Sequence, residues 1–461
     1  MKTKSLTYYF QNLAVAIALA LALSFNSCKQ QQVFKAEPFK VEHVKWSLNT
    51  TLYEVNIRQY TSEGTFSAFE EHLPRLKELG VGILWLMPIH PIGELERKGT
   101  LGSYYSIQDY KGINPEFGNM EDFKRLVKKA HELDMKIILD WVANHTSHDN
   151  PLVHNHPEWF ERDSLGNLIS PFDWTDVVQL DYKNDDLRDY MVSALKFWVE
   201  EADIDGYRCD VANLVPTDFW NRVREELENI KPVFMLAEAE EVELQKFAFD
   251  ADYGWEFHHI MNDIAKGKKT AMDIDHYFQR ELAKYPKNTI RMHFTSNHDE
   301  NSWAGTEFTR LGKGVKTFAA LTFVIPGIPL LYNGQEVAFD KMLEFFDKDL
   351  IDWTPNPEFT EFYSKLINLK KENSALMAGE GGADMFRVKT SNDVNVFAFT
   401  RENDKNKIFA VFNLSSLHQN IDLHGDAYIG EYKELFSNET VTFNANSKLT
   451  LNPWSFNIYF Y

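Results

Sequence analysis

Cysteine is nearly absent from the 461 residues, because Cys28 and Cys209 are the only two. Two thiols cannot build a disulfide framework or the Cys-rich ligand set of a structural zinc site. Cys209 lies between Arg208 and Asp210 and points to the opposite face of the expected strand. We interpret it as a packed core thiol.

Positive charge is also scarce, since 48 Lys and Arg stand against 68 Asp and Glu, for a net charge of −20. Recognition of nucleic acid or of an anionic membrane surface needs basic patches, so neither is expected as a partner. A neutral substrate is compatible with this balance, although acidity alone also serves solubility and fixes no function.

Long apolar runs are missing apart from residues 13–23 near the N-terminus. This run is too short for a membrane span, and it follows Lys2 and Lys4, as in a secretory signal. Cys28 comes soon after it, which resembles a bacterial lipoprotein signal whose cysteine is lipidated. We therefore expect a signal segment at 1–28, a tether at 29–45, and an exported protein whose lipid anchor holds it at the periplasmic face or cell surface of a bacterium. A lipidated Cys28 would leave no disulfide within the chain.

Apolar, β-rich runs alternate with helical patterns over residues 46–375, which favours a (β/α)8 TIM barrel. The expected strands are residues 52–60, 81–88, 136–143, 206–211, 233–237, 249–255, 290–295 and 328–332. The expected helices include residues 66–79, 120–133, 187–202 and 216–230. Residues of about 145–186 form a long β3–α3 loop excursion, and such loops on a barrel usually build the binding site. From 376 to 461, short alternating runs and turns predict a C-terminal antiparallel β-sandwich domain.

Acidic residues follow three of these apolar runs. Asp210 ends one run, Glu238 ends the next, and Asp299 follows a later one. A barrel keeps its catalytic groups at the C-terminal ends of its strands, and two facing carboxyl groups are what glycoside hydrolysis requires. Arg208 shares a strand face with Asp210 and would favour its ionised form, although an Arg–Asp pair taken alone is more often a structural ion pair.

The chain resembles the α-amylase superfamily, glycoside hydrolase family 13, over roughly residues 46–461. The resemblance rests on several motifs that occur in family order. They are residues 80–88, 105–110 with 113–118, 140–145, 206–210, Glu238, 297–299 and 327–336.

The resemblance implies a retaining hydrolase of α-1,4-glucosidic bonds in starch, maltodextrins or related α-glucans. Asp210 would be the nucleophile that forms a covalent glycosyl-enzyme, Glu238 the acid/base, and Asp299 the third carboxylate, which holds sugar hydroxyls. The two other carboxyl groups would favour the protonated form of Glu238 that an acid needs.

Four further residues match substrate-binding positions of the family. Arg208, His298 and His145 match polar contacts in the cleavage subsite, and Tyr105 matches the aromatic that stacks on the same sugar, with Tyr104 beside it as the alternative. Trp174, Trp303 and Trp353 are candidates for outer sugar contacts, for which core packing is equally consistent.

Neither a cofactor nor a metal is expected to take part in the chemistry. Structural Ca2+ stays open, because Asn144 matches one family ligand while Gln179 stands at the usual ligand aspartate. Asn213 and Leu214 likewise replace the family's frequent Lys-His pair. The histidines near residue 150 match no zinc spacing.

Two alternatives remain open from the residues alone. An α-glucosidase or α-glucan transglycosylase of the same family would carry the same motifs. A family member that only binds glycans would be expected to have lost one of the three carboxylates, and here all three are present.

Overall fold

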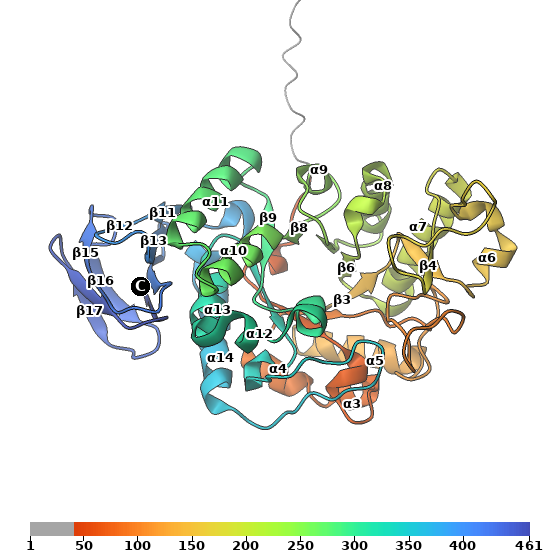
Figure 1. Cartoon of the computed structure of the whole chain (residues 1–461), viewed down its shortest axis with the longest axis horizontal. Coiled ribbons are helices and arrows are strands. Elements are labelled where there is room, and N and C mark those ends of the chain that lie inside the picture. Colours follow the sequence, from red (N-terminus) through yellow and green to blue (C-terminus); the bar gives the residue numbers. More distant parts are fainter. Residues whose placement is uncertain (1–40) are drawn as a thin grey trace, which may run out of the picture. The chain divides into compact units, whose positions relative to one another are not determined.

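Eight parallel strands close into a barrel in the computed structural model, which describes residues 41–461 (Figure 1). The order around the barrel is β1-β10-β9-β8-β7-β6-β3-β2. The strands are β1 (Leu52–Val55), β2 (Ile83–Leu86), β3 (Lys136–Trp141), β6 (Gly206–Cys209), β7 (Phe234–Ala237), β8 (Ala251–Tyr253), β9 (Ile290–His293) and β10 (Ile328–Tyr332). The expected TIM barrel is confirmed. The predicted signal segment and most of the predicted tether lie outside the described residues.

Helices surround the barrel and cover the outward face of its strands. Side chains such as Leu52, Ile138 and Leu236 fill the barrel interior, whereas their neighbours pack outward against helices. The longer helices are α5 (Met120–Glu132), α7 (Asp185–Ala202), α8 (Thr217–Glu228), α10 (Trp255–Ala265), α11 (Ala271–Lys284), α13 (Val315–Val324) and α14 (Pro357–Glu372). Cys209 is fully buried in the outer layer, as expected.

Two expected elements are each divided. The run 52–60 leaves the strand after Val55, because the Asn56 side chain caps a helical turn, α2 (Ile57–Tyr60), by accepting a hydrogen bond from the Gln59 N–H. The run 66–79 forms α3 (Phe66–Glu70) and α4 (Leu73–Leu79) instead of one helix. Pro74 lies in the first turn of α4, where its missing N–H costs nothing, and this favours a new helix start there.

The excursion between β3 and α7 has structure of its own. β4 (His145–Ser147) pairs antiparallel with β5 (Val177–Gln179), and between them lie α6 (Leu152–Asn155) and a short 3-10 turn at Pro157–Trp159. The pairing turns the start and the end of the excursion back to the barrel rim, so that both can contribute to a site there.

One glycine is required where β6 meets β7. Gly206 has a φ of +146°, and a Cβ there would lie 1.9 Å from the carbonyl oxygen of Phe234. No other residue permits this approach, so Gly206 sets the pairing that carries Arg208 alongside Leu236.

The C-terminal part consists of two antiparallel sheets, as predicted. One has the order β11-β13-β14-β19-β16-β17 and the other β12-β15-β18. Their strands are β11 (Met385–Arg387), β12 (Lys389–Thr390), β13 (Val396–Glu402), β14 (Lys407–Asn413), β15 (Gln419–His424), β16 (Gly430–Glu434), β17 (Thr440–Phe443), β18 (Lys448–Leu451) and β19 (Phe456–Phe460). Side chains such as Val411 and Ile421 form a core between the sheets, which is the packing of a sandwich.

The larger sheet also packs on the barrel. Phe397, Phe399 and Phe412 belong to the same apolar cluster as Phe318 and Phe323 of α13. Both faces of β13 and β14 are therefore buried, one in the sandwich and one on the barrel. Of the helices in residues 41–461, none is long and apolar enough to cross a membrane.

Candidate active site

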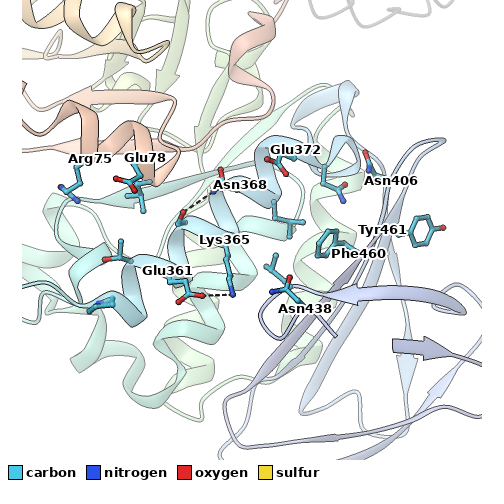
Figure 2. Close-up of a pocket in the computed structure, with 17 residues that line it drawn as sticks. Arg75, Glu78, Glu361, Lys365, Asn368, Glu372, Asn406, Asn438, Phe460 and Tyr461 are labelled. Atoms are coloured by element: carbon cyan, nitrogen blue, oxygen red, sulfur yellow. Dashed lines mark hydrogen bonds and ion pairs between the residues drawn. The ribbon is translucent and has the colours of Figure 1, made fainter. Parts of the chain in front are cut away.

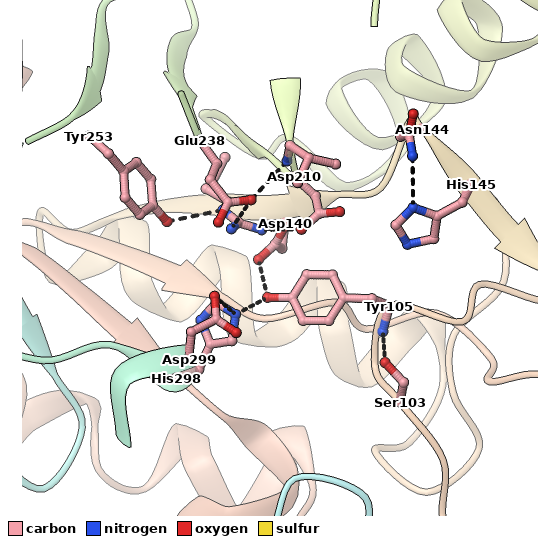
Figure 3. A network of polar contacts seen from close by, with 12 residues as sticks. Ser103, Tyr105, Asp140, Asn144, His145, Asp210, Glu238, Tyr253, His298 and Asp299 are labelled. Carbon is pink, nitrogen blue, oxygen red and sulfur yellow. Dashed lines mark hydrogen bonds and ion pairs between the residues drawn. The ribbon is translucent and has the colours of Figure 1, made fainter. Parts of the chain in front are cut away.

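A cavity of about 470 Å³ opens at the C-terminal ends of the barrel strands. It gathers all three carboxyl groups that the sequence singled out, together with the predicted Tyr105, His145 and His298 (Figure 3). Its lining also includes Lys98, Ser103, Asp173, Trp174, Asp176, Val177, Val211, Trp303, Phe345 and Phe346. Asp210 and Glu238 come from the ends of β6 and β7, which are neighbours in the barrel. The strand-end pattern thus brings together residues from distant parts of the sequence.

Arg208 stands behind this cavity and joins its carboxyl groups. The fully buried guanidinium places Nη1 3.0 Å from Asp210 Oδ1 and Nη2 2.8 Å from Glu238 Oε2. Its Nε–H donates to the Tyr253 hydroxyl at 3.2 Å. One rigid cation therefore bridges the two carboxyl groups and fixes their mutual position.

Asp140 is a member of this cluster that the sequence reasoning did not assign. It lies directly opposite Arg208 in the β3–β6 pair, is fully buried, and accepts a hydrogen bond from Arg208 Nη1 at 2.7 Å. Its other oxygen accepts from Trp85 Nε1 at 3.1 Å and from the Tyr105 hydroxyl at 3.0 Å. Its position in an inward-facing strand end, at the start of the motif 140–145, was the available signal.

Tyr105 and His298 form the opposite wall of the cavity. The Tyr105 hydroxyl donates to Asp140, and its oxygen accepts from His298 Nε2 at 2.8 Å. The two rings are stacked with centroids 5.4 Å apart. Tyr104 instead lies under Arg58, 4.3 Å from the guanidinium carbon to the ring centroid, and does not line the cavity. The structure therefore places Tyr105, and not its neighbour, beside the carboxyl groups.

His145 presents a neutral imidazole to the cavity. Burial lowers its pKa to about 3. Asn144 Nδ2 lies 3.3 Å from His145 Nδ1 and donates to it, so the proton sits on Nε2 and can be donated to a ligand. Trp174 of the excursion packs beside the ring, with centroids 5.2 Å apart.

The carboxyl groups shift one another's titration. Burial raises the pKa of Asp210 well above its usual range; Arg208 opposes this effect, and the charges of Glu238, Asp140 and Asp299 add to it. Burial likewise raises the pKa of Asp140 and of Asp299. Arg208 therefore offsets only part of the rise in the Asp210 pKa that burial causes. The expectation for Asp210 from the sequence included the arginine but not the burial. Asp140, Asp210 and Asp299 therefore hold their protons to a higher pH than exposed carboxyl groups do.

Aromatic side chains extend the cavity beyond the carboxyl groups. Trp174 and Trp303 both line it, as does Phe345, whose ring lies 5.3 Å from that of Trp303. Trp353 lies elsewhere, against Tyr60 and Arg75. Phe345 was missed because it belongs to a loop after β10 that carries no motif.

A larger groove of about 830 Å³ lies between α4, α14 and the C-terminal domain. Figure 2 shows one ion pair in its lining, between Glu361 and Lys365 at 2.9 Å, and a hydrogen bond that Asn368 Nδ2 donates to Ser364 Oγ. It holds none of the predicted site residues. We therefore assign the candidate active site to the smaller cavity.

The two residues that match family calcium-ligand positions, Asn144 and Gln179, are both neutral amides. Asn144 turns its amide nitrogen toward His145, and Gln179, opposite His145 in the β4–β5 pair, is a neutral amide. Calcium takes six to eight oxygen ligands, several of them usually from carboxylates. Neither of these two residues supplies a carboxylate. Within residues 41–461, no group of three or more His, Cys, Asp or Glu side chains is arranged to hold a metal ion.

Comparison with known proteins agrees with this geometry. The family model described as "Alpha amylase, catalytic domain" matches residues 21–165 and 154–353, and "Maltogenic Amylase, C-terminal domain" matches residues 386–458. The crystal structure of a noncanonic maltogenic alpha-amylase from Thermotoga neapolitana is 32% identical with a TM-score of 0.82, over 90% of this chain and 98% of that one. An alpha-amylase from Lactobacillus plantarum is 33% identical with a TM-score of 0.80, over 90% and 99%. The maltogenic alpha-amylase of Bacillus acidopullulyticus is 27% identical, over 86% of this chain and 70% of the relative.

The catalytic-domain match spans most of the barrel, and the two similar structures cover nearly the whole described chain. The chain therefore belongs to the α-amylase family of glycoside hydrolases.

Proposed function

We propose that the protein is a retaining hydrolase that cleaves α-1,4-glucosidic bonds in starch or maltodextrins. The observation that carries the proposal is the single guanidinium of Arg208, which contacts both Asp210 and Glu238 and holds them on one side of the cavity. Retaining enzymes need two carboxyl groups closer together than inverting enzymes do, because no water stands between the nucleophile and the sugar.

In this mechanism Glu238 donates a proton to the leaving glycosidic oxygen while Asp210 attacks the anomeric carbon. The C–O bond to the leaving sugar breaks as the ester bond to Asp210 forms. Glu238 then takes a proton from water, which attacks the same carbon and releases Asp210. Arg208 lies on the Asp210 carboxylate throughout and favours its ionised form as it leaves.

The remaining wall residues bind the sugar. Asp299, the most exposed of the three carboxyl groups, accepts hydrogen bonds from sugar hydroxyls in this proposal. His145 offers an N–H donor, His298 lines the wall beside Asp299, and Tyr105 offers a ring face. Trp174 and Trp303 lengthen the cavity with aromatic surface, which supports an oligosaccharide substrate rather than a single glucoside. The names of the similar proteins support the same substrate class, since they are alpha-amylases and maltogenic alpha-amylases.

The test is a proton NMR time course of maltoheptaose cleavage by the purified protein. We expect the α-anomer of the new reducing end to appear first and then mutarotate, because two displacements retain configuration. The sizes of the products separate the alternatives: a spread of shorter oligosaccharides indicates hydrolysis within the chain, glucose alone an α-glucosidase, and products longer than the substrate a transglycosylase. Initial release of the β-anomer, or binding without turnover, would refute the proposal.

We further propose that the protein is exported and anchored by lipid on Cys28. The support is the sequence alone: two lysines, the apolar run 13–23, and then this cysteine. In a bacterial host that processes lipoproteins, the full-length chain is expected in the membrane fraction, and Cys28→Ser in the soluble fraction, because the anchor is lost. Cys209→Ser is the matched control, since that thiol is buried. An unchanged membrane fraction for Cys28→Ser would contradict the anchor.

A further inference from the structure

Glu54 is a carboxylate inside the barrel to which the mechanism gives no role. It lies on β1, is fully buried, and places Oε1 2.5 Å from Nδ1 of His298. Its second oxygen is also buried and has no hydrogen-bond partner in the part of the chain that the structure describes. The His298 imidazole is therefore the hydrogen-bond partner of this carboxylate.

The other side of the same ring meets acceptors as well. His298 Nε2 faces the Tyr105 oxygen at 2.8 Å and Asp299 Oδ2 at 3.4 Å. The Tyr105 hydrogen is already donated to Asp140, so the tyrosine can only accept from the ring. Both ring nitrogens thus face acceptors, and only the doubly protonated imidazolium satisfies both.

We propose that Glu54 is a positioning residue that holds His298 as an oriented imidazolium, and that this cation in turn keeps Asp299 ionised for the sugar. The inference rests on the proposed function, because it assigns the reason for the charge of a substrate-binding ring. The order of charges across the wall is negative at Glu54, positive at His298 and negative at Asp299. Without the negative charge of Glu54, His298 would carry its positive charge less readily. The negative charge of Asp299 would then be less well balanced against the buried carboxyl groups beside it.

The charged groups around His298 agree with this assignment. Burial lowers the pKa of the His298 ring, and the charge of Arg208 lowers it as well. The charges of Asp299 and Glu54 and the hydrogen bond to Glu54 have a larger, opposite effect, and the pKa rises to about 9. Asp140 on β3 also interacts favourably with the charged ring, and Tyr105 contacts it through its oxygen. A group with a raised pKa stays charged below that value, so His298 is a cation throughout the neutral range.

The first measurement needs no substrate. In full-length protein labelled with 15N-histidine, we expect both ring nitrogens of His298 to be protonated at pH 7 and to titrate near pH 9, with the signal identified by its loss in His298→Asn. An unprotonated Nδ1 at pH 7 would overturn the inference, because the proton of the pair would then sit on Glu54. This result stands whether or not maltoheptaose is hydrolysed, so its failure is distinct from a failure of the proposed function.

The second measurement uses Glu54→Gln, which keeps the acceptor and removes the charge. We expect the alkaline limb of kcat/KM on maltoheptaose to move down by about one pH unit or more, and kcat/KM at pH 7 to fall about tenfold. Glu336→Gln is the matched control, since that carboxyl is equally buried but bonds to Tyr53 and Arg75, outside the site. An alkaline limb that stays in place in Glu54→Gln, or moves equally in Glu336→Gln, would refute the role. If Glu54→Gln does not fold, the titration of the wild-type ring decides alone.

Discussion

Replacing Asp210 by Asn is expected to lower kcat on maltoheptaose about 10⁴-fold or more, while the protein still folds and binds the sugar. A neutral amide cannot form the ester with the anomeric carbon that the two-step mechanism needs. Its oxygen can still accept the hydrogen bond from Arg208, now 3.0 Å from Asp210 Oδ1, so the wall of the cavity stays in place. The measurements are kcat, the melting temperature, and calorimetric binding of maltoheptaose to the inactive variant.

The control for this result is Asp252→Asn. Asp252 is also fully buried at a barrel strand end and pairs with Arg291, but it does not line the cavity. We expect this control to lose far less activity than Asp210→Asn once both are compared as folded protein. Activity of Asp210→Asn within tenfold of the wild type would rule out Asp210 as the nucleophile.

Arg208→Met is expected to cost about 3–5 kcal/mol of stability in addition to activity, because it leaves buried carboxyl groups without their cation. The arginine contacts three of them, Asp140, Asp210 and Glu238, at 2.7 to 3.0 Å. Burial already raises the pKa of Asp140 and of Asp210, and removal of the cation raises them further. Stability should therefore depend on pH more steeply in the variant than in the wild type.

The sign of that dependence follows from proton binding. A carboxyl whose pKa is higher in the folded state holds a proton that the unfolded chain releases, so stability falls as pH rises. Urea unfolding of Arg208→Met should give a smaller loss at pH 5 than at pH 8. Arg224→Met is a suitable comparison, since Arg224 is also buried and pairs with Asp250 at 2.6 Å outside the cavity. A loss of stability that is the same at both pH values would contradict the account of the cluster.

Much of the fold could be predicted because alternation between strand and helix patterns is a local signal. The runs around β3, β6 and β10 are largely buried and bounded by turns, so their positions differ from expectation by a few residues at most. The end of β1 was misplaced because apolar Ile57 and Tyr60 continue the run, while the decisive interaction is the cap by Asn56. A single hydrogen bond of this kind leaves little trace in an apolar pattern.

The site was predictable where chemistry coincides with a strand end. Asp210, Glu238 and Arg208 stand out for that reason, and Arg208 contacts both carboxyl groups from behind the cavity. Glu54 did not receive a role, because it lies within a strand whose inward face only the closed barrel defines. Asp140 opens the motif 140–145 at a strand end, and this signal was not used. Phe345 approaches from a loop after β10, and its contact with Trp303 depends on a path that no local pattern encodes.

The sheet that is buried on both faces changes what residues 376–461 are to the enzyme. Phe397 and Phe412 stand in one apolar cluster with Phe318 and Phe323 of α13, and the buried Arg401 donates hydrogen bonds to the carbonyl oxygens of Val324 and Ile325. The sandwich is thus part of the outer wall of the barrel, not an appendage that can be exchanged as a module. A domain that replaced it would need a surface complementary to α13, so substitutions in the two surfaces must be compatible with each other.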